Sequence, residues 1–195
     1  MNERYIRQTM IPEIGEAGQE KLKNAKVLIV GIGGLGSPIS IYLTAAGVGQ
    51  IGLIDDDIVS KSNLQRQILY TETEIGQSKV ECACRRLSAL NSSKPTVFYP
   101  NRFTSDNADR LVSAYDIIID GCDNAATRYL IDDVCSRFKK PYVYGSISEF
   151  RGQLPRWTSI QRSLSPPRSY SPGSSQRSYR HYSGNYRLHG SRRSD

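Results

Sequence analysis

The stretch KVLIVGIGGLGSP, residues 26–38, joins an apolar run to a glycine-rich turn and then to a helical segment. Its glycines fit the spacing G-x-G-x-x-G at Gly31, Gly33 and Gly36. In such turns the first glycine allows a tight bend, the second lets a phosphate approach the backbone, and the third allows close packing of helix on strand. The stretch therefore predicts a nucleotide-binding turn. It leaves open whether the phosphates belong to a redox dinucleotide or to ATP.

Apolar runs alternate with helical stretches along residues 1–153. We expect strands at 26–30, 51–55, 96–100, 116–120 and 141–145. We expect helices at about 14–24, 36–46, 77–90, 105–114 and 124–138. In the segment 77–90 one face would carry, at helical spacing, Val80, Cys84, Leu87 and Leu90. Strands separated by helices predict an α/β fold with a Rossmann-like, doubly wound, mostly parallel sheet.

The composition changes after Gln153. Residues 154–195 contain eleven serines and eight arginines but a single acid, so they carry the net charge of +7 by themselves. We expect a disordered basic tail there, because so few aliphatic side chains cannot offset the cost of ordering the backbone. Residues 1–153 are expected to form one nucleotide-binding domain. Their acidic and basic side chains balance, which makes nucleic-acid binding by this domain unlikely.

The remaining composition indicates a cytoplasmic protein that does not enter membranes. No apolar run reaches the length that spans a bilayer, and the charged amino terminus has no secretory pattern. None of the four cysteines forms a Cys-x-x-Cys pair, so no zinc site is expected.

Two cationic side chains distinguish the candidate nucleotides. Asp55 ends the strand after the glycine turn, where a carboxylate holds a ribose hydroxyl. Arg66 and Lys79 follow, and a redox dinucleotide has no need of them, whereas a reacting triphosphate needs its charge neutralised. Taken alone, either of the two is better explained as a solvated surface residue, as most arginines and lysines are.

A third motif follows the strand at 116–120. Ligands bind at the carboxyl edge of open parallel sheets, and this strand delivers Asp120 and Asp123 to that edge. A carboxylate there can hold magnesium against phosphate oxygens. Asn124 would cap the next helix. Cys122 is expected to be a packing residue, because no histidine is available to activate its thiol.

The motifs together resemble the ThiF/MoeB/HesA family, whose members are relatives of the ubiquitin-activating enzymes. The resemblance covers about residues 4–153. The matching segments are RYIRQ, PEIGEAGQEKL, VLIVGIGGLGSP, AAGVGQIGLIDDD, SNLQRQ, IGQSKVE, DGCDNAATRYLIDD and PYVYGSISEFRGQ.

The resemblance implies an adenylyltransferase that uses ATP and magnesium. In this family the carboxyl terminus of a ubiquitin-like sulfur carrier, ending in Gly-Gly, attacks the α-phosphate of ATP. Asp55 would hold the ribose, Asp123 the magnesium, and Arg7 would reach into the site of a homodimer partner. The implied catalytic residues are Arg7, Arg66, Lys79 and Asp123. The implied nucleotide-binding residues are Gly31, Gly33, Gly34, Gly36, Asp55, Asp57, Ser62, Asn63, Leu64, Gln65, Arg66, Lys79, Asp123 and Asn124.

The tail departs from the family pattern. Complete members continue with another strand, a crossover loop and zinc-binding Cys-x-x-Cys pairs, none of which follows Gln153. We expect residues 154–195 to be out-of-frame or otherwise replaced sequence, and a truncated chain that binds ATP weakly and adenylates poorly. In the rival interpretation the tail is a true extension that binds RNA or an acidic partner.

Two other functions stay open from the sequence. One is an NAD-dependent oxidoreductase on the same turn, which Arg66, Lys79 and Asp123 disfavour. The other is a non-catalytic interaction protein that acts through its tail. Within the adenylyltransferase reading, the thiamine and molybdopterin pathways are equally open.

Overall fold

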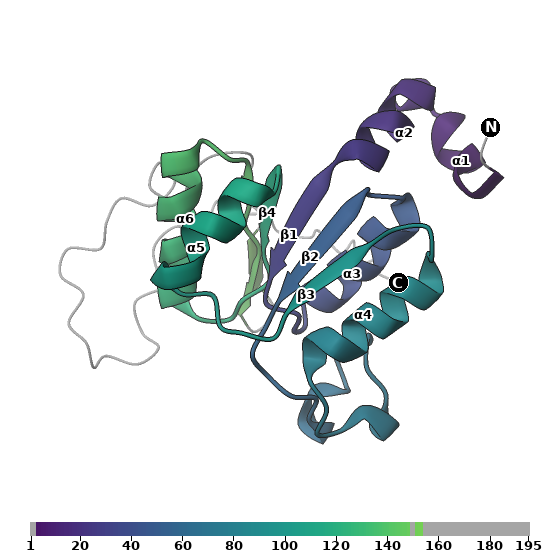
Figure 1. Cartoon of the computed structure of the whole chain (residues 1–195). Helices are drawn as coiled ribbons and strands as arrows, with labels where there is room; N and C mark the ends of the chain where they lie inside the picture. Colours follow the sequence, from purple (N-terminus) through teal and green to yellow (C-terminus); the bar gives the residue numbers. More distant parts are fainter. Residues whose placement is uncertain (1–2, 149–150, 154–195) are drawn as a thin grey trace, which may run out of the picture.

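Five parallel strands form the central sheet of this chain (Figure 1). The computed structural model describes residues 3–148 and 151–153. The sheet order is β3-β2-β1-β4-β5. Its strands are Lys26–Val30 (β1), Gln50–Ile54 (β2), Thr96–Tyr99 (β3), Ile117–Asp120 (β4) and Tyr142–Val143 (β5). The predicted Rossmann-like, doubly wound class is confirmed.

Helices cover both faces of this sheet. The helices longer than one turn in the described residues are Gly15–Asn24 (α2), Gly36–Ala46 (α3), Lys79–Leu90 (α4), Ser105–Ala114 (α5) and Ala125–Phe138 (α6). Helices α5 and α6 lie side by side over one face, while α3 and α4 pack on the other (Figure 1). Every predicted strand and helix is present, with boundaries shifted by at most two residues. The described part of the chain holds no helix with the length and apolar character that crossing a bilayer requires.

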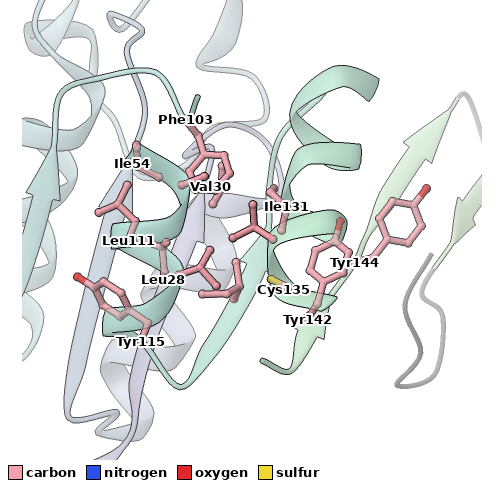
Figure 2. Packing of buried hydrophobic residues seen from close by; sticks show 14 residues of the cluster. Leu28, Val30, Ile54, Phe103, Leu111, Tyr115, Ile131, Cys135, Tyr142 and Tyr144 are labelled. Carbon is pink, nitrogen blue, oxygen red and sulfur yellow. The ribbon is translucent and has the colours of Figure 1, made fainter. Parts of the chain in front are cut away.

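The alternation of side chains along β1 explains why both faces are covered. Leu28 and Val30 point into the core beneath α5 and α6, which Figure 2 shows, while Val27 and Ile29 enter the core beneath α3 and α4. All four are buried. Burying one such side chain contributes roughly 1.5–3 kcal/mol relative to leaving it in water. A strand that is apolar throughout therefore fits the middle of a sheet with two covered faces.

The buried face of α4 differs from the predicted one. Val80 and Leu87 are fully buried as expected, but the residue between them on this face is Ala83. Cys84 is half-buried, and Leu90 at the end of the helix is 37% exposed. Leu90 thus keeps the helical spacing of the predicted face, but its side chain is not part of the buried core.

The order of the strands creates a switch point between β1 and β4. From β1 the chain adds β2 and β3 on one side, and it then returns to add β4 and β5 on the other. The loops that follow β1 and β4 consequently leave the sheet in opposite directions at the same carboxyl edge. In open α/β sheets this is where ligands bind.

Several short elements were not predicted. They are Glu3–Tyr5 (η1), Ile6–Thr9 (α1), Lys61–Asn63 (η2), Glu72–Glu74 (η3), and an antiparallel hairpin of Ser146–Ser148 (β6) with Arg151–Gln153 (β7). The expected tail, residues 154–195, lies outside the described residues. The domain boundary at Gln153 therefore stays a prediction.

Candidate functional site

Two of the fingerprint glycines are required by the fold itself. Gly31 has a left-handed φ of 87°, and a Cβ there would lie 2.9 Å from the backbone of Gly121 and Cys122. A Cβ on Gly36 would overlap the carbonyl oxygen of Gly31. These glycines let the β1–α3 turn close against the loop after β4, as the fingerprint predicts.

The fold does not require glycine at positions 33 and 34. Neither has a positive φ, and a Cβ on either would meet its nearest neighbours at 3.5–3.6 Å, which is ordinary contact. In the described part of the chain, the backbone N–H groups of Gly33, Gly34 and Leu35 find no hydrogen-bond acceptor. Helix α3 also begins here without a side-chain cap. The turn thus offers bare amide groups and open space to an anion.

The peptide backbone of Ile32 is held on both sides. Its N–H donates to Asp55 Oδ2 at 2.7 Å, and its carbonyl oxygen accepts from the Tyr70 hydroxyl at 2.8 Å. Asp55 Oδ1 also accepts from the N–H of Asp57 at 2.9 Å. Burial raises the pKa of Asp55, and the two backbone hydrogen bonds oppose that rise. Asp55, predicted as a ribose ligand, therefore also holds the backbone of the turn through Ile32. Tyr70, which holds the same residue from the other side, was not predicted from the sequence.

The segment after η2 lies next to the turn. Arg66 is exposed, and its side-chain Cδ would lie 3.6 Å from a Cβ on Gly34. Gln67 is 4% exposed, and its Nε2 lies next to Gly33. The side chain of Arg66 thus lies at the turn, as predicted. The neighbouring Gln67 is buried beside Gly33.

The other predicted residues of this segment are more peripheral. Ser62 and Gln65 are exposed, while Asn63 and Leu64 are half-buried. The Asn63 carbonyl accepts from the N–H groups of Arg66 and Gln67 at 3.1 and 2.9 Å. Asn63 therefore shapes the backbone that presents Arg66.

Lys79 is a buried cation at the start of α4. Its side chain is 4% exposed, and its Nζ lies 2.8 Å from Asp57 Oδ2. Asp57 is itself 68% exposed. The alternative that Lys79 is a solvated surface residue is therefore wrong. A buried ammonium with one exposed partner can interact with a further anion at this edge of the sheet.

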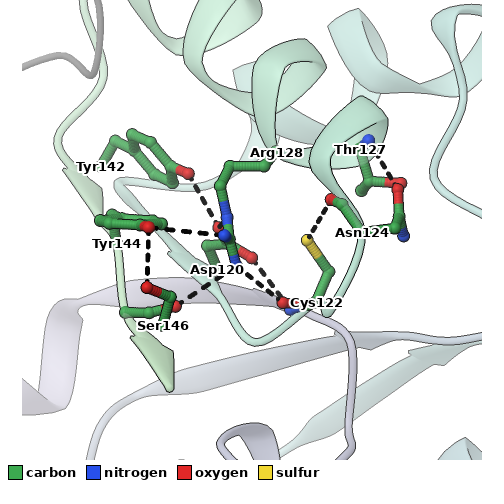
Figure 3. A network of polar contacts seen from close by, with 9 residues as sticks. Asp120, Cys122, Asn124, Thr127, Arg128, Tyr142, Tyr144 and Ser146 are labelled. Atoms are coloured by element: carbon green, nitrogen blue, oxygen red, sulfur yellow. Dashed lines mark hydrogen bonds and ion pairs between the residues drawn. The ribbon is translucent and has the colours of Figure 1, made fainter. Parts of the chain in front are cut away.

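An ion pair that sequence reasoning missed organises the loop after β4 (Figure 3). Arg128 Nε lies 2.8 Å from Asp120 Oδ2, and Asp120 also accepts from Tyr142 at 3.0 Å. Arg128 Nη2 donates to the carbonyl of Cys122 at 3.0 Å. Its guanidinium lies 4.6 Å from the centre of the Tyr144 ring. One side chain thus fixes the path of the loop that carries Asp123.

The predicted residues of that loop have separate roles. Asp123 is exposed, whereas Asn124 Oδ1 accepts from the N–H of Thr127 at 2.8 Å and caps α6 as expected. Cys122 is half-buried and packs against the core, as predicted. Burial, reinforced by Asp120, raises the pKa of the Cys122 thiol to about 12, which argues against a nucleophilic role.

An open pocket of about 340 Å³ lies beside this loop, between the segment that joins β3 to α5 and the first turns of α6. Of the predicted site residues, Asn124 alone lines it. The lining residues are Arg102, Phe103, Thr104, Asn124, Ala126, Thr127 and Leu130.

Two places at this edge offer carboxylates to a cation. Asp55, Asp56 and Asp57 bring one ligand atom each within 4.8 Å of one another. Asp123, the predicted magnesium residue, stands apart from this group and has no bonded partner among the described residues. A lone exposed carboxylate fits Mg²⁺, which keeps most of its ligands as water and phosphate oxygens.

Arg7 lies away from these residues. It is exposed on α1, between two residues that anchor the amino terminus. Gln8 Nε2 donates to the Ala46 carbonyl at 3.1 Å, and the Tyr5 hydroxyl accepts from Asn91 at 2.9 Å. Ala46 ends α3, whose other end forms the glycine turn roughly 16 Å away. Arg7 therefore does not join the site of its own chain.

The sequence pattern of the ThiF family matches residues 5–170. A sulfur carrier protein adenylyltransferase of Thermus thermophilus is 47% identical over 152 residues, which are 78% of this chain and 56% of the relative. The adenylyltransferase and sulfurtransferase MOCS3 of Culex quinquefasciatus is 50% identical over 151 residues, or 77% and 34% of the two chains. This chain thus spans about half of the first relative's length and a third of the second's.

Solved structures share the fold. The crystal structure of E. coli MccB with AMPCPP and MccA superimposes with a TM-score of 0.72 at 29% identity. The likeness covers 80% of this chain and 48% of MccB.

Proposed function

Because the chain belongs to the ThiF family, we propose that its glycine turn binds ATP for the adenylation of a carboxylate at the end of a ubiquitin-like sulfur carrier. The Thermus relative is a sulfur carrier protein adenylyltransferase, and MccB binds AMPCPP, an ATP analogue; both support this choice of substrates. The proposal concerns the part of the reaction that involves ATP. The relatives extend well beyond the residues that match this chain, so the rest of their activity is left aside.

One observation carries the proposal: Gly33 and Gly34 are glycines that the fold does not need. Their backbone would accept a side chain, yet among the described residues no acceptor meets their N–H groups at the start of α3. Such a cradle suits a phosphate, which takes amide hydrogen bonds and benefits from the positive end of the helix dipole.

The surrounding charges fit a triphosphate better than a redox dinucleotide. The side chain of Arg66 lies next to Gly34, and Lys79 is a buried cation whose one ion-pair partner among the described residues is the exposed Asp57. In the proposed reaction both side chains stabilise the negative charge that grows on the phosphates as pyrophosphate leaves. In hydride transfer by an NAD-dependent oxidoreductase, by contrast, no negative charge grows on the phosphates for these cations to stabilise.

Asp55 and Asp123 complete the proposed site. Asp55 keeps free lone pairs on both carboxylate oxygens for the ribose hydroxyls, although each oxygen already accepts one backbone hydrogen bond. Asp123 would hold magnesium, which would neutralise part of the phosphate charge when bound. The nucleophile is already an anionic carboxylate, so the reaction needs positioning and charge stabilisation rather than a general base.

The partners follow from the same proposal. The carrier would end in Gly-Gly, and either the thiamine or the molybdopterin pathway would supply it. Arg7 would act in the site of a second subunit in a homodimer, which agrees with its distance from the glycine turn of its own chain.

Carrier-dependent exchange of labelled pyrophosphate into ATP tests the proposal. We expect slow exchange that requires a carrier with an intact Gly-Gly end and that Asp123→Asn abolishes. Asp133→Asn, which changes an exposed carboxylate on α6 far from the loop, is the matched control and should leave the exchange rate unchanged. Equal exchange with and without the carrier would contradict the proposed substrate.

A further inference from the structure

Tyr70 is a buried residue outside the predicted site, yet it contacts the glycine turn directly. It is 6% exposed and packs in the core between the sheet and α4. Its hydroxyl donates to the Ile32 carbonyl at 2.8 Å, across 38 residues of sequence. The neighbouring Ser37 hydroxyl approaches the same carbonyl at 3.4 Å, a much weaker contact.

The geometry of one peptide unit makes this contact relevant to a ligand. The peptide bond is planar, so the Ile32 carbonyl and the Gly33 N–H lie in one plane and point in opposite directions. A hydroxyl that holds the carbonyl inward therefore turns the Gly33 N–H outward. That N–H has no acceptor in the described part of the chain.

The preceding peptide unit is held as well. The Ile32 N–H donates to Asp55 Oδ2 at 2.7 Å, so both polar backbone groups of Ile32 have side-chain partners. Two anchored groups on one residue leave its backbone little freedom to rotate. A hydrogen bond to a carbonyl also polarises the N–H of the same peptide, which strengthens that N–H as a donor.

We propose that Tyr70 is a positioning residue that orients the Gly33 N–H toward the phosphates of the bound nucleotide. The inference rests on the proposed function of the turn, and it adds a residue that acts through the backbone without touching the ligand. Burial, with a smaller contribution from Asp55, raises the pKa of Tyr70 well above its usual value. The hydroxyl therefore stays protonated, and able to donate, throughout the neutral pH range.

The variant Tyr70→Phe removes only the hydroxyl and keeps the ring in the core. We expect its affinity for ATP·Mg²⁺ to fall about three- to tenfold in calorimetric titrations, as the loss of one hydrogen bond predicts. In steady-state assays the loss should appear mainly in the KM for ATP rather than in kcat, since the reacting groups are untouched.

Tyr115→Phe is the matched control. Tyr115 is 1% exposed in the other core, and its hydroxyl contacts Tyr99 at 3.1 Å. This variant also removes one buried hydroxyl, but no part of the glycine turn touches it. We expect it to keep wild-type affinity for ATP·Mg²⁺. An equal loss in both variants would mean that Tyr70 has only a general structural role and would overturn the inference.

A nucleotide-free measurement separates this inference from the proposed function. In hydrogen-exchange experiments on the free protein, Tyr70→Phe should speed exchange of the Ile32 N–H several-fold, while Tyr115→Phe leaves it unchanged. If the wild-type chain binds no ATP, the proposed function fails, and faster exchange at Ile32 would still support the positioning role. An unchanged exchange rate of the Ile32 N–H in Tyr70→Phe, or an unchanged affinity of this variant for ATP, would overturn the positioning role of Tyr70.

Discussion

Arg128 and Asp120 form a buried ion pair that joins the first turn of α6 to the end of β4. The side chain of Asp120 is fully buried, and that of Arg128 is 13% exposed. Because Arg128 also donates to the carbonyl of Cys122, the pair sets the path of the loop that leads to Asp123.

Arg128→Met should destabilise the fold strongly. The substitution leaves the Asp120 carboxylate buried without its cation, which costs about 3 kcal/mol or more. Urea denaturation measures the free energy of unfolding. Arg137→Met is the control, because the Arg137 pairs with Asp109 and Asp133 are half-exposed and should contribute less than about 1 kcal/mol. Similar losses in the two variants would contradict a dominant role for the buried pair.

The fingerprint glycines should separate into two classes. Gly36→Ala should destabilise the fold by about 2 kcal/mol or more, because its Cβ would overlap the Gly31 carbonyl. Gly33→Ala should change stability by less than about 1 kcal/mol, since its Cβ has room. Thermal or urea unfolding of both variants checks this division. A Gly33→Ala variant as unstable as Gly36→Ala would show that the fold does require that glycine.

Lys79→Met should weaken nucleotide binding without harming the fold. Methionine fills a similar buried volume, and Asp57, being largely exposed, can be solvated once its partner is gone. We expect unchanged or slightly raised stability together with ATP·Mg²⁺ affinity reduced about tenfold or more. The control is Lys21→Met, which removes an exposed lysine of α2. If Lys79→Met unfolds the chain or binds ATP normally, the assigned role is wrong.

Cys122 should react slowly with alkylating agents in the native protein. Its thiol has a pKa raised to about 12 from 9.0, so about a thousandfold less thiolate is present near neutral pH than in an unfolded chain. Mass spectrometry after iodoacetamide treatment at pH 8, with and without urea, measures this protection. Cys122→Ala should also keep ATP binding. Rapid native alkylation would instead identify Cys122 as a reactive thiol.

The order of elements could be predicted because the sequence alternates between two clear periodicities. Apolar runs such as 26–30 and the glycine turn locate β1 and α3 to within a residue. Leu90 shows the limit of this approach, since helical spacing identifies a face of the helix but not which residues on that face are buried. Short elements such as η1 and α1 depend on tertiary contacts and carry no periodic signal.

The candidate site was predictable only where its residues follow a motif. The glycines, Asp55, Arg66 and Lys79 stand at recognisable positions. Tyr70 could not be found, because its role depends on a contact across 38 residues. The sequence did contain a signal for Arg128. Because Asn124 was predicted to cap the helix after β4, Arg128 could be placed in the first turn of α6, close to the end of β4.

Titration of the wild-type chain with ATP·Mg²⁺ and with NADH, alongside Gly33→Ala, tests the central claim most directly. Gly152→Ala, which adds the same methyl group at another unstrained glycine, is the control. We expect ATP·Mg²⁺ to bind in preference to NADH, and Gly33→Ala to lower this affinity about tenfold while Gly152→Ala leaves it unchanged. Preferential binding of NADH, or full ATP affinity in Gly33→Ala, would contradict an ATP site at the glycine turn.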